Sequence, residues 1–200
     1  MDIEITIQSL NKHGFNAKYY PTKEQATEEL CASLHGTSIG IGGCKTAEQM
    51  GLYERLCEDN EVIWHWRAED RNAAQISAAH AKVYIMSANA LSETGEIVNI
   101  DGNGNRVASM LYGHDRVIFV VGINKLTPDL HSAVERPRNV ASPLNARRFG
   151  RKTPCVLTEP MRCHDCSSPE RICNGMVILM EKMSSIKETD VYLIGEDLGY

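Results

Sequence analysis

Four cysteines lie close together in the sequence, with the spacing Cys155-x7-Cys163-x2-Cys166-x6-Cys173. Thiolates are soft ligands that bind zinc or an iron–sulfur cluster, including a 4Fe–4S cluster. The spacing matches neither a zinc ribbon, which has two Cys-x2-Cys pairs, nor the bacterial ferredoxin motif. We predict that the cysteine-rich loop at 153–175 holds such a cluster or zinc. Free thiols or a regulatory disulfide are the alternatives.

A glycine-rich segment follows a short apolar stretch and precedes a helical pattern. Glycines let backbone N–H groups approach a ligand, and a helix N-terminus favours an anion. The spacing fits neither a Walker loop nor a dinucleotide-binding fingerprint. A tight turn is the alternative, and Cys44 is either a thiol with a lowered pKa or a small core residue. The residues predicted to bind an anion here are Gly40, Gly42, Gly43, Cys44, Lys45 and Thr46.

Polar side chains also follow a second apolar stretch, at 87–96. Ser87 and Asn89 are expected to point into a binding crevice. Glu93 is a candidate nucleophile or general base, because a positioned carboxylate can attack a substrate or remove a proton. The alternative is that Glu93 is a solvated turn residue, since most carboxylates are exposed.

Two further segments carry groups that could bind a polar or anionic ligand. The first, at 99–106, contains two turn dipeptides and is either a ligand-binding loop or a purely structural one. Its candidate binding residues are Asn99, Asp101, Asn105 and Arg106. Lys125 comes just after an apolar run, where a substrate phosphate or carboxylate would lie. The alternative for Lys125 is an ordinary surface lysine.

Strand and helix patterns alternate along the chain. The run at 117–121 is continuously apolar, as expected of a central strand covered on both faces. This alternation predicts an α/β fold with a Rossmann-like, mostly parallel sheet flanked by helices, whose binding crevice lies at the carboxyl ends of the strands. Strands are expected at 15–20, 37–41, 61–66, 83–86, 97–100, 116–121, 176–180 and 191–194. Helices are expected at 3–12, 22–34, 46–57, 72–81, 105–112 and 128–136.

Composition limits the classes of partner. The 200 residues carry a formal net charge of −5, which argues against nucleic acid or an anionic membrane as the main partner. No apolar run approaches the ~20 residues that span a bilayer. The first residues do not read as a secretory signal, and the seven cysteines are odd in number, so we expect a reducing, cytoplasmic location. The length predicts one domain over 1–200.

Several longer motifs resemble those of the LUD-domain (lactate utilisation, YkgG-type) family. They are GIGGCKTAEQMGL, SANALSETGEIVNIDGNGNRVA, VIFVVGINK, PLNARR, TPCVLTEPMRCHDCSSPERICN and GEDLGY. The resemblance implies the NagB/RpiA/CoA-transferase-like fold, whose better-known members bind sugar phosphates, CoA or related anions. CoA transferases of that fold use a glutamate in a Ser-Glu-Asn-Gly element. Ser92–Gly95 is similar, with Glu93 in place and Thr94 departing from the pattern.

The resemblance implies a role in the use of lactate or a related small hydroxy acid, with an anionic small molecule as ligand. It also implies iron–sulfur partner subunits, and a homo-oligomer is left open. One alternative is a stand-alone CoA transferase or sugar-phosphate isomerase that uses Glu93 or Asp101. The other is a non-catalytic partner subunit. Catalysis by the chain alone is left open.

Overall fold

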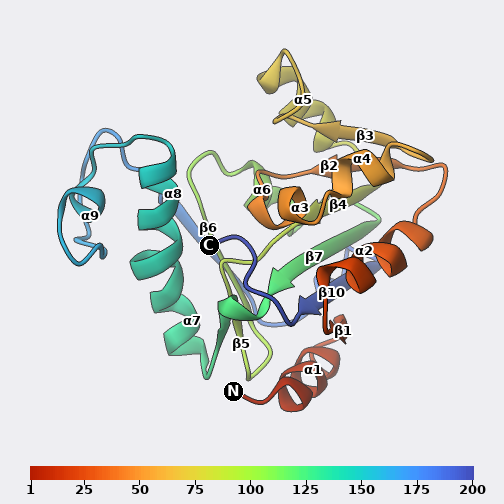
Figure 1. The fold of residues 1–200 in the computed structure, drawn as a ribbon, viewed down its shortest axis with the longest axis horizontal. Helices are drawn as coiled ribbons and strands as arrows, with labels where there is room; N and C mark the ends of the chain where they lie inside the picture. Colours follow the sequence, from red (N-terminus) through yellow and green to blue (C-terminus); the bar gives the residue numbers. More distant parts are fainter.

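The computed structural model describes residues 1–200 and contains two sheets (Figure 1). The helices are α1 (Ile3–Lys12), α2 (Lys23–Ala32), α3 (Lys45–Gln49), α4 (Leu52–Leu56), α5 (Arg71–Ala78), α6 (Asn105–Ser109), α7 (Leu130–Arg136), α8 (Ser142–Arg148) and α9 (Pro154–Leu157). The strands are β1 (Asn16–Tyr20), β2 (Ser38–Ile41), β3 (Glu61–Trp64), β4 (Val83–Met86), β5 (Ala90–Ser92), β6 (Ile97–Asp101), β7 (Arg116–Gly122), β8 (Leu126–Thr127), β9 (Gly175–Leu179) and β10 (Glu188–Ile194).

The main sheet has six strands in the order β1-β10-β7-β4-β2-β3, and every neighbouring pair is parallel. This confirms the predicted α/β fold with a parallel sheet. The central strand β7 contributes Ile118 and Val120 to one hydrophobic core and Phe119 and Val121 to the other. Alternation along a strand sends successive side chains to opposite faces, so a continuously apolar strand is buried on both sides.

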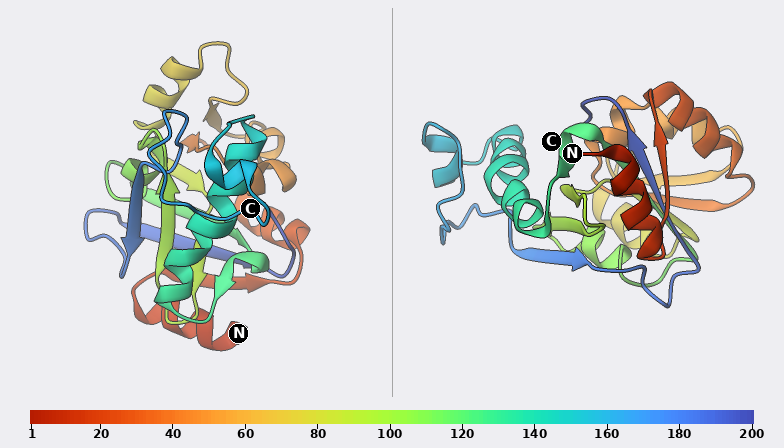
Figure 2. Two further views of the ribbon diagram at one scale, coloured as in Figure 1. Left: turned by 90° about the vertical axis from the view of Figure 1, so that its left-hand side faces the viewer. Right: turned by 90° about the horizontal axis from the view of Figure 1, so that it is seen from below.

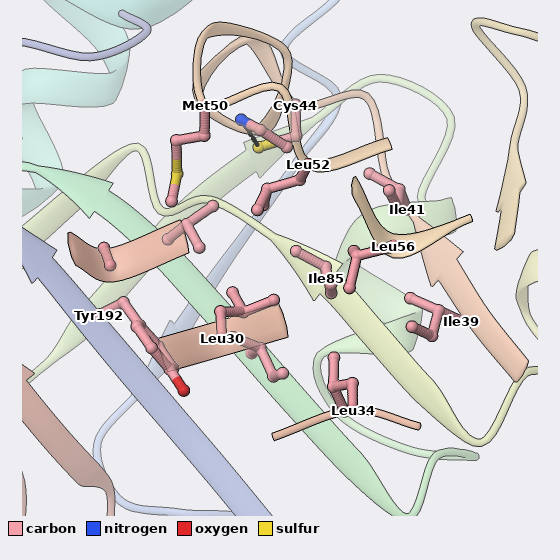
Figure 3. Close-up of a cluster of buried hydrophobic side chains, with 14 of the residues drawn as sticks. Leu30, Leu34, Ile39, Ile41, Cys44, Met50, Leu52, Leu56, Ile85 and Tyr192 are labelled. Carbon is pink, nitrogen blue, oxygen red and sulfur yellow. Dashed lines mark hydrogen bonds between the residues drawn. The ribbon is translucent and has the colours of Figure 1, made fainter. Parts of the chain in front are cut away.

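Helices α2, α3 and α4 pack on one face of the main sheet. Their apolar side chains, such as Leu30 and Leu52, form a core with Ile39, Ile85 and Tyr192 (Figure 3). The other core contains residues of α1 and α5 together with the second sheet. Amphipathic helices and sheets are stabilised in this way, by burying apolar faces against each other.

The second sheet has four strands in the order β8-β5-β6-β9. Strands β6 and β9 pair antiparallel, as do β5 and β6, whereas β5 and β8 are parallel. The stretches expected at 97–100 and 176–180 are therefore strands, but they belong to this smaller sheet. Their antiparallel partners explain why they do not continue the parallel series.

The helices expected at 72–81 and 105–112 end about three residues early, and two other expected helices differ more in extent. The helix expected at 46–57 is two short helices, because the chain turns at Gly51, which has left-handed backbone geometry. The helix expected at 128–136 continues beyond α7, through one π-helical turn (Pro137–Ala141) into α8. Figure 2 shows this long helical segment and α9 to one side of the main sheet. No helix has the length and apolar character needed to cross a membrane.

Candidate functional site

A cavity of about 310 Å³ lies at the carboxyl ends of neighbouring main-sheet strands. The segments that follow β2, β4 and β7 converge there because these strands are adjacent in the sheet. Residues of α8 and the last two residues of the chain complete the wall. Ten of the predicted binding residues line the cavity: Gly43, Cys44, Lys45, Thr46, Ser87, Asn89, Asp101, Asn105, Arg106 and Lys125.

Lys125 lies at the base of this cavity, in a 3-10 turn (Ile123–Lys125) directly after β7. It is only 3% exposed, which excludes the surface-lysine alternative. Its Nζ donates hydrogen bonds to Thr46 Oγ1 at 2.9 Å and to Ser87 Oγ at 2.8 Å, and it forms no salt bridge. Burial, together with the nearby guanidinium groups of Arg136 and Arg106, lowers the pKa of Lys125 to about 7.

A second basic residue, the partly buried Arg136, supports the wall of the site from α7. Its guanidinium donates to the backbone oxygens of Asn124 at 3.1 Å, Asn89 at 2.5 Å and Tyr200 at 3.2 Å. The acceptors of Asn124 and Asn89 are neutral peptide carbonyls, whereas Tyr200 is the last residue of the chain and carries its terminal carboxyl group. Burial lowers the pKa of Arg136 to about 10. Of the two residues, only Lys125 is held by neutral groups alone.

Asp101 and Arg106 organise the loop between β6 and α6. The Asp101 carboxylate accepts hydrogen bonds from the backbone N–H groups of Asn103 and Arg106, both at 3.2 Å, and lies 3.4 Å from Arg106 Nε. Arg106 also donates to the Ile100 carbonyl at 2.7 Å. These contacts hold Asp101 as a structural carboxylate at the cavity wall.

Three of the predicted binding residues lie behind the cavity wall. Gly40 is inside β2, and Gly42 is packed so closely that a Cβ there would lie 3.0 Å from Arg106 Cγ. Asn99 is fully buried, and its Oδ1 accepts from the backbone N–H of Asn89 at 3.2 Å. These residues position the loops of the site rather than face a ligand.

Cys44 is the N-cap residue of α3, and its Sγ accepts from the backbone N–H of Ala47 at 3.3 Å (Figure 3). Burial raises the pKa of its thiol, which favours the alternative of a small core residue over a thiol with a lowered pKa. Helix α3 has only five residues, which makes its dipole a weak source of anion attraction. The positive field of the cavity comes from its side chains instead.

Sequence reasoning did not assign an aromatic and cationic group at the rim. Arg148 of α8 lies 5.2 Å from the ring of Trp66 and 4.1 Å from the ring of Phe149. Arg151 lines the same rim and has no ionic partner. The signal in the sequence was the local concentration of arginines at 147–151 in a chain that is acidic as a whole.

Charge in the cavity is opposite in sign to that of the chain. Five basic side chains line it, and Asp101 is the single acidic side chain among the lining residues. The basic residues are Lys45, Arg106, Lys125, Arg148 and Arg151. An arrangement of this kind attracts anions, and the low-dielectric walls strengthen the attraction.

Glu93 lies outside this cavity. It follows β5 in the second sheet, and its carboxylate accepts a hydrogen bond from the backbone N–H of Asp2. Its own backbone N–H donates to the Thr127 carbonyl at 2.8 Å. The structure therefore does not bring Glu93 together with the other predicted site residues.

Of the four cysteines of the predicted ligand set, one lies on α9 and three lie between α9 and β9, where 158–174 contain no helix or strand. Cys155 lies on α9, with its Sγ 3.2 Å from Thr153 Oγ1, and Cys163 Sγ lies 3.9 Å from an Arg138 nitrogen. Burial raises the pKa of the Cys173 thiol. All four thiols, Cys166 included, are free, and no three Cys, His, Asp or Glu side chains are gathered in a geometry that could hold a metal ion. The structure thus provides no support for the expected metal site.

Comparisons with known proteins agree with the fold. The family model described as LUD domain matches residues 3–194. A crystal structure of a DUF162 family protein from Deinococcus radiodurans superposes with a TM-score of 0.58 over 96% of each chain, at 13% sequence identity. No curated protein matches the chain. At this identity the structural likeness shows a shared fold and nothing finer.

Proposed function

Because the chain belongs to the LUD-domain family, we propose that it serves lactate utilisation by binding lactate or a related small hydroxy acid in the cavity. Family membership supports the metabolic role, and the positive cavity supports an anionic ligand. The observation that carries the proposal is the concentration of five basic side chains around a cavity in a chain of net charge −5.

One buried basic residue, Lys125, strengthens the argument. A charge removed from water is costly unless it is paired, and the hydrogen-bond partners of Lys125 are two neutral hydroxyl groups. A carboxylate entering the cavity would offset that cost. Binding of the ligand would then also remove this electrostatic penalty.

Cavity size favours a small ligand. Sites for drug-sized molecules occupy ~300–1,000 Å³, and this cavity of about 310 Å³ is at the lower end of that range. A hydroxy acid fits within such a volume, whereas most of CoA would remain outside. The CoA-transferase alternative also depends on Glu93, which lies elsewhere, and the isomerase alternative depends on Asp101, which is held by Arg106.

Calorimetric titration of the protein with lactate tests the proposal. Changing Arg148 and Arg151 together to glutamine removes two exposed rim charges, each worth ~0.2–1 kcal/mol, so the affinity should fall roughly 2- to 30-fold. Arg55→Gln, on α4 and away from the cavity, is the matched control. Affinity should also fall with added salt. If neither lactate nor any other small organic acid binds, the proposal is overturned.

A metal or cluster at the four cysteines stays a separate prediction, as do iron–sulfur partner subunits. Nothing in the proposed binding step passes through that segment. Ile172, beside Cys173, lines the cavity, and its carbonyl lies 2.8 Å from where a Cβ at Gly102 would be placed. The cysteine segment is therefore packed against the wall of the proposed ligand site.

A further inference from the structure

Lys125 combines three properties that a purely structural lysine does not need. Its amine is buried, opens onto a ligand-sized cavity, and is held by two hydroxyl groups rather than by a carboxylate. Gly199 lies directly against it. A Cβ at that position would be 2.8 Å from Lys125 Nζ and 2.7 Å from Thr46 Oγ1, so any larger residue there would displace the amine or its hydroxyl partner.

We propose that Lys125 is a nucleophile that captures a 2-oxo acid in this cavity as an imine. The inference rests on the proposed function, because it uses the same cavity and the same carboxylate-binding cations. It goes further in assigning a covalent step and a second class of ligand. A 2-oxo acid is the oxidation product of a 2-hydroxy acid, so the two ligands differ only at the carbon that Lys125 would attack.

The arrangement of charges favours a 2-oxo acid among carbonyl compounds. Its carboxylate and its carbonyl carbon are adjacent, so both fit in a cavity of about 310 Å³. Arg106, Arg148 and Arg151 line the same space and can receive the carboxylate. The carbonyl group would then face the amine at the base of the site.

The chemical step is balanced without a cofactor. The neutral amine of Lys125 attacks the carbonyl carbon and forms a carbinolamine. Loss of water then forms the C=N bond, and the carbonyl oxygen leaves with the two hydrogens that the amine nitrogen has given up. Thr46 Oγ1 and Ser87 Oγ lie 2.9 Å and 2.8 Å from Nζ and 3.3 Å from each other, so they can orient the amine and relay its protons.

The surroundings of Lys125 keep the reactive form available. Burial and the neighbouring guanidinium groups of Arg136 and Arg106 oppose protonation, and the pKa of about 7 leaves much of the amine neutral near pH 7. A lysine that only attracts an anion by charge works best when fully protonated. The absence of a carboxylate partner, which would keep it protonated, therefore favours the nucleophilic role.

Reductive trapping tests the inference on the full chain. Wild-type protein is incubated with pyruvate and cyanoborohydride, and intact mass and peptide mapping locate the reduced adduct. We expect one adduct per chain, on Lys125. Lactate, which has the same carboxylate but no carbonyl, should give none. Lys125→Arg keeps the charge and should lose the adduct, whereas Lys187→Arg, at an exposed surface lysine, should retain it.

The results separate this inference from the proposed function. Lactate binding by calorimetry together with no pyruvate adduct would overturn the nucleophilic role and leave the binding site standing. Adducts spread evenly over surface lysines would also overturn it. These readouts come from the wild-type protein, so they decide the question even if a variant at Lys125 does not fold.

Discussion

Replacing Lys125 with methionine is expected to stabilise the protein at acidic pH. Burial lowers the pKa of Lys125 from 10.5 to about 7, so the folded chain binds this proton less readily than the unfolded chain. Below pH 7 the folded state carries the whole cost of a buried ammonium group. That cost disappears as the pH rises from 7 towards 10.5. The difference of 10.5 − 7, at about 1.4 kcal/mol per pH unit, corresponds to about 5 kcal/mol.

Methionine has a similar length and carries no charge, so it removes this cost and keeps most of the packing. The hydroxyls of Thr46 and Ser87 can pair with each other, since they are 3.3 Å apart. Urea unfolding should show that the variant is several kcal/mol more stable than wild type at about pH 6. This difference in the free energy of unfolding should become smaller by about pH 9. The same variant should lose the pyruvate adduct.

Lys187→Met is the matched control. Lys187 is exposed and lies 2.8 Å from Asp115, which raises the pKa of Lys187. Both folded and unfolded chains therefore keep this lysine protonated through pH 6–9, and the variant should show no pH-dependent gap. If the free energy of unfolding of Lys125→Met changes with pH as that of wild type does, the reasoning about a buried, unpaired amine is refuted. It is refuted too if the variant is less stable than wild type at about pH 6.

Three further substitutions probe the other assignments. Gly42→Ala places a Cβ 3.0 Å from Arg106 Cγ, so Arg106 must move. Lactate affinity measured by calorimetry should therefore fall. Unchanged affinity would show that Arg106 does not contact the ligand. Glu93→Gln should leave lactate affinity unchanged because Glu93 lies outside the cavity, and a loss of binding would return it to the site. Serine at both Cys163 and Cys166 should abolish iron or zinc uptake measured after anaerobic reconstitution, and wild-type protein that takes up neither metal would contradict the four-cysteine hypothesis.

The sequence by itself determined the main sheet and the location of the site. A continuously apolar strand such as 117–121 has only one stable environment, covered on both faces, and helices between successive strands make those strands parallel. The carboxyl ends of parallel strands share one edge, so the polar residues that follow β2, β4 and β7 had to meet. Thr46, Ser87 and Lys125, which follow these three strands, line one cavity at that edge.

Only the tertiary structure decided which residues face the cavity and in what state. Strand pattern does not specify a strand's partner, so the assignment of β6 and β9 to a second sheet depends on long-range pairing. That pairing carries Asn99 into the core and leaves Glu93 outside the cavity, beside the backbone of Asp2. The chemistry of Lys125 depends on desolvation and on neighbours brought from distant parts of the chain, which local sequence does not encode.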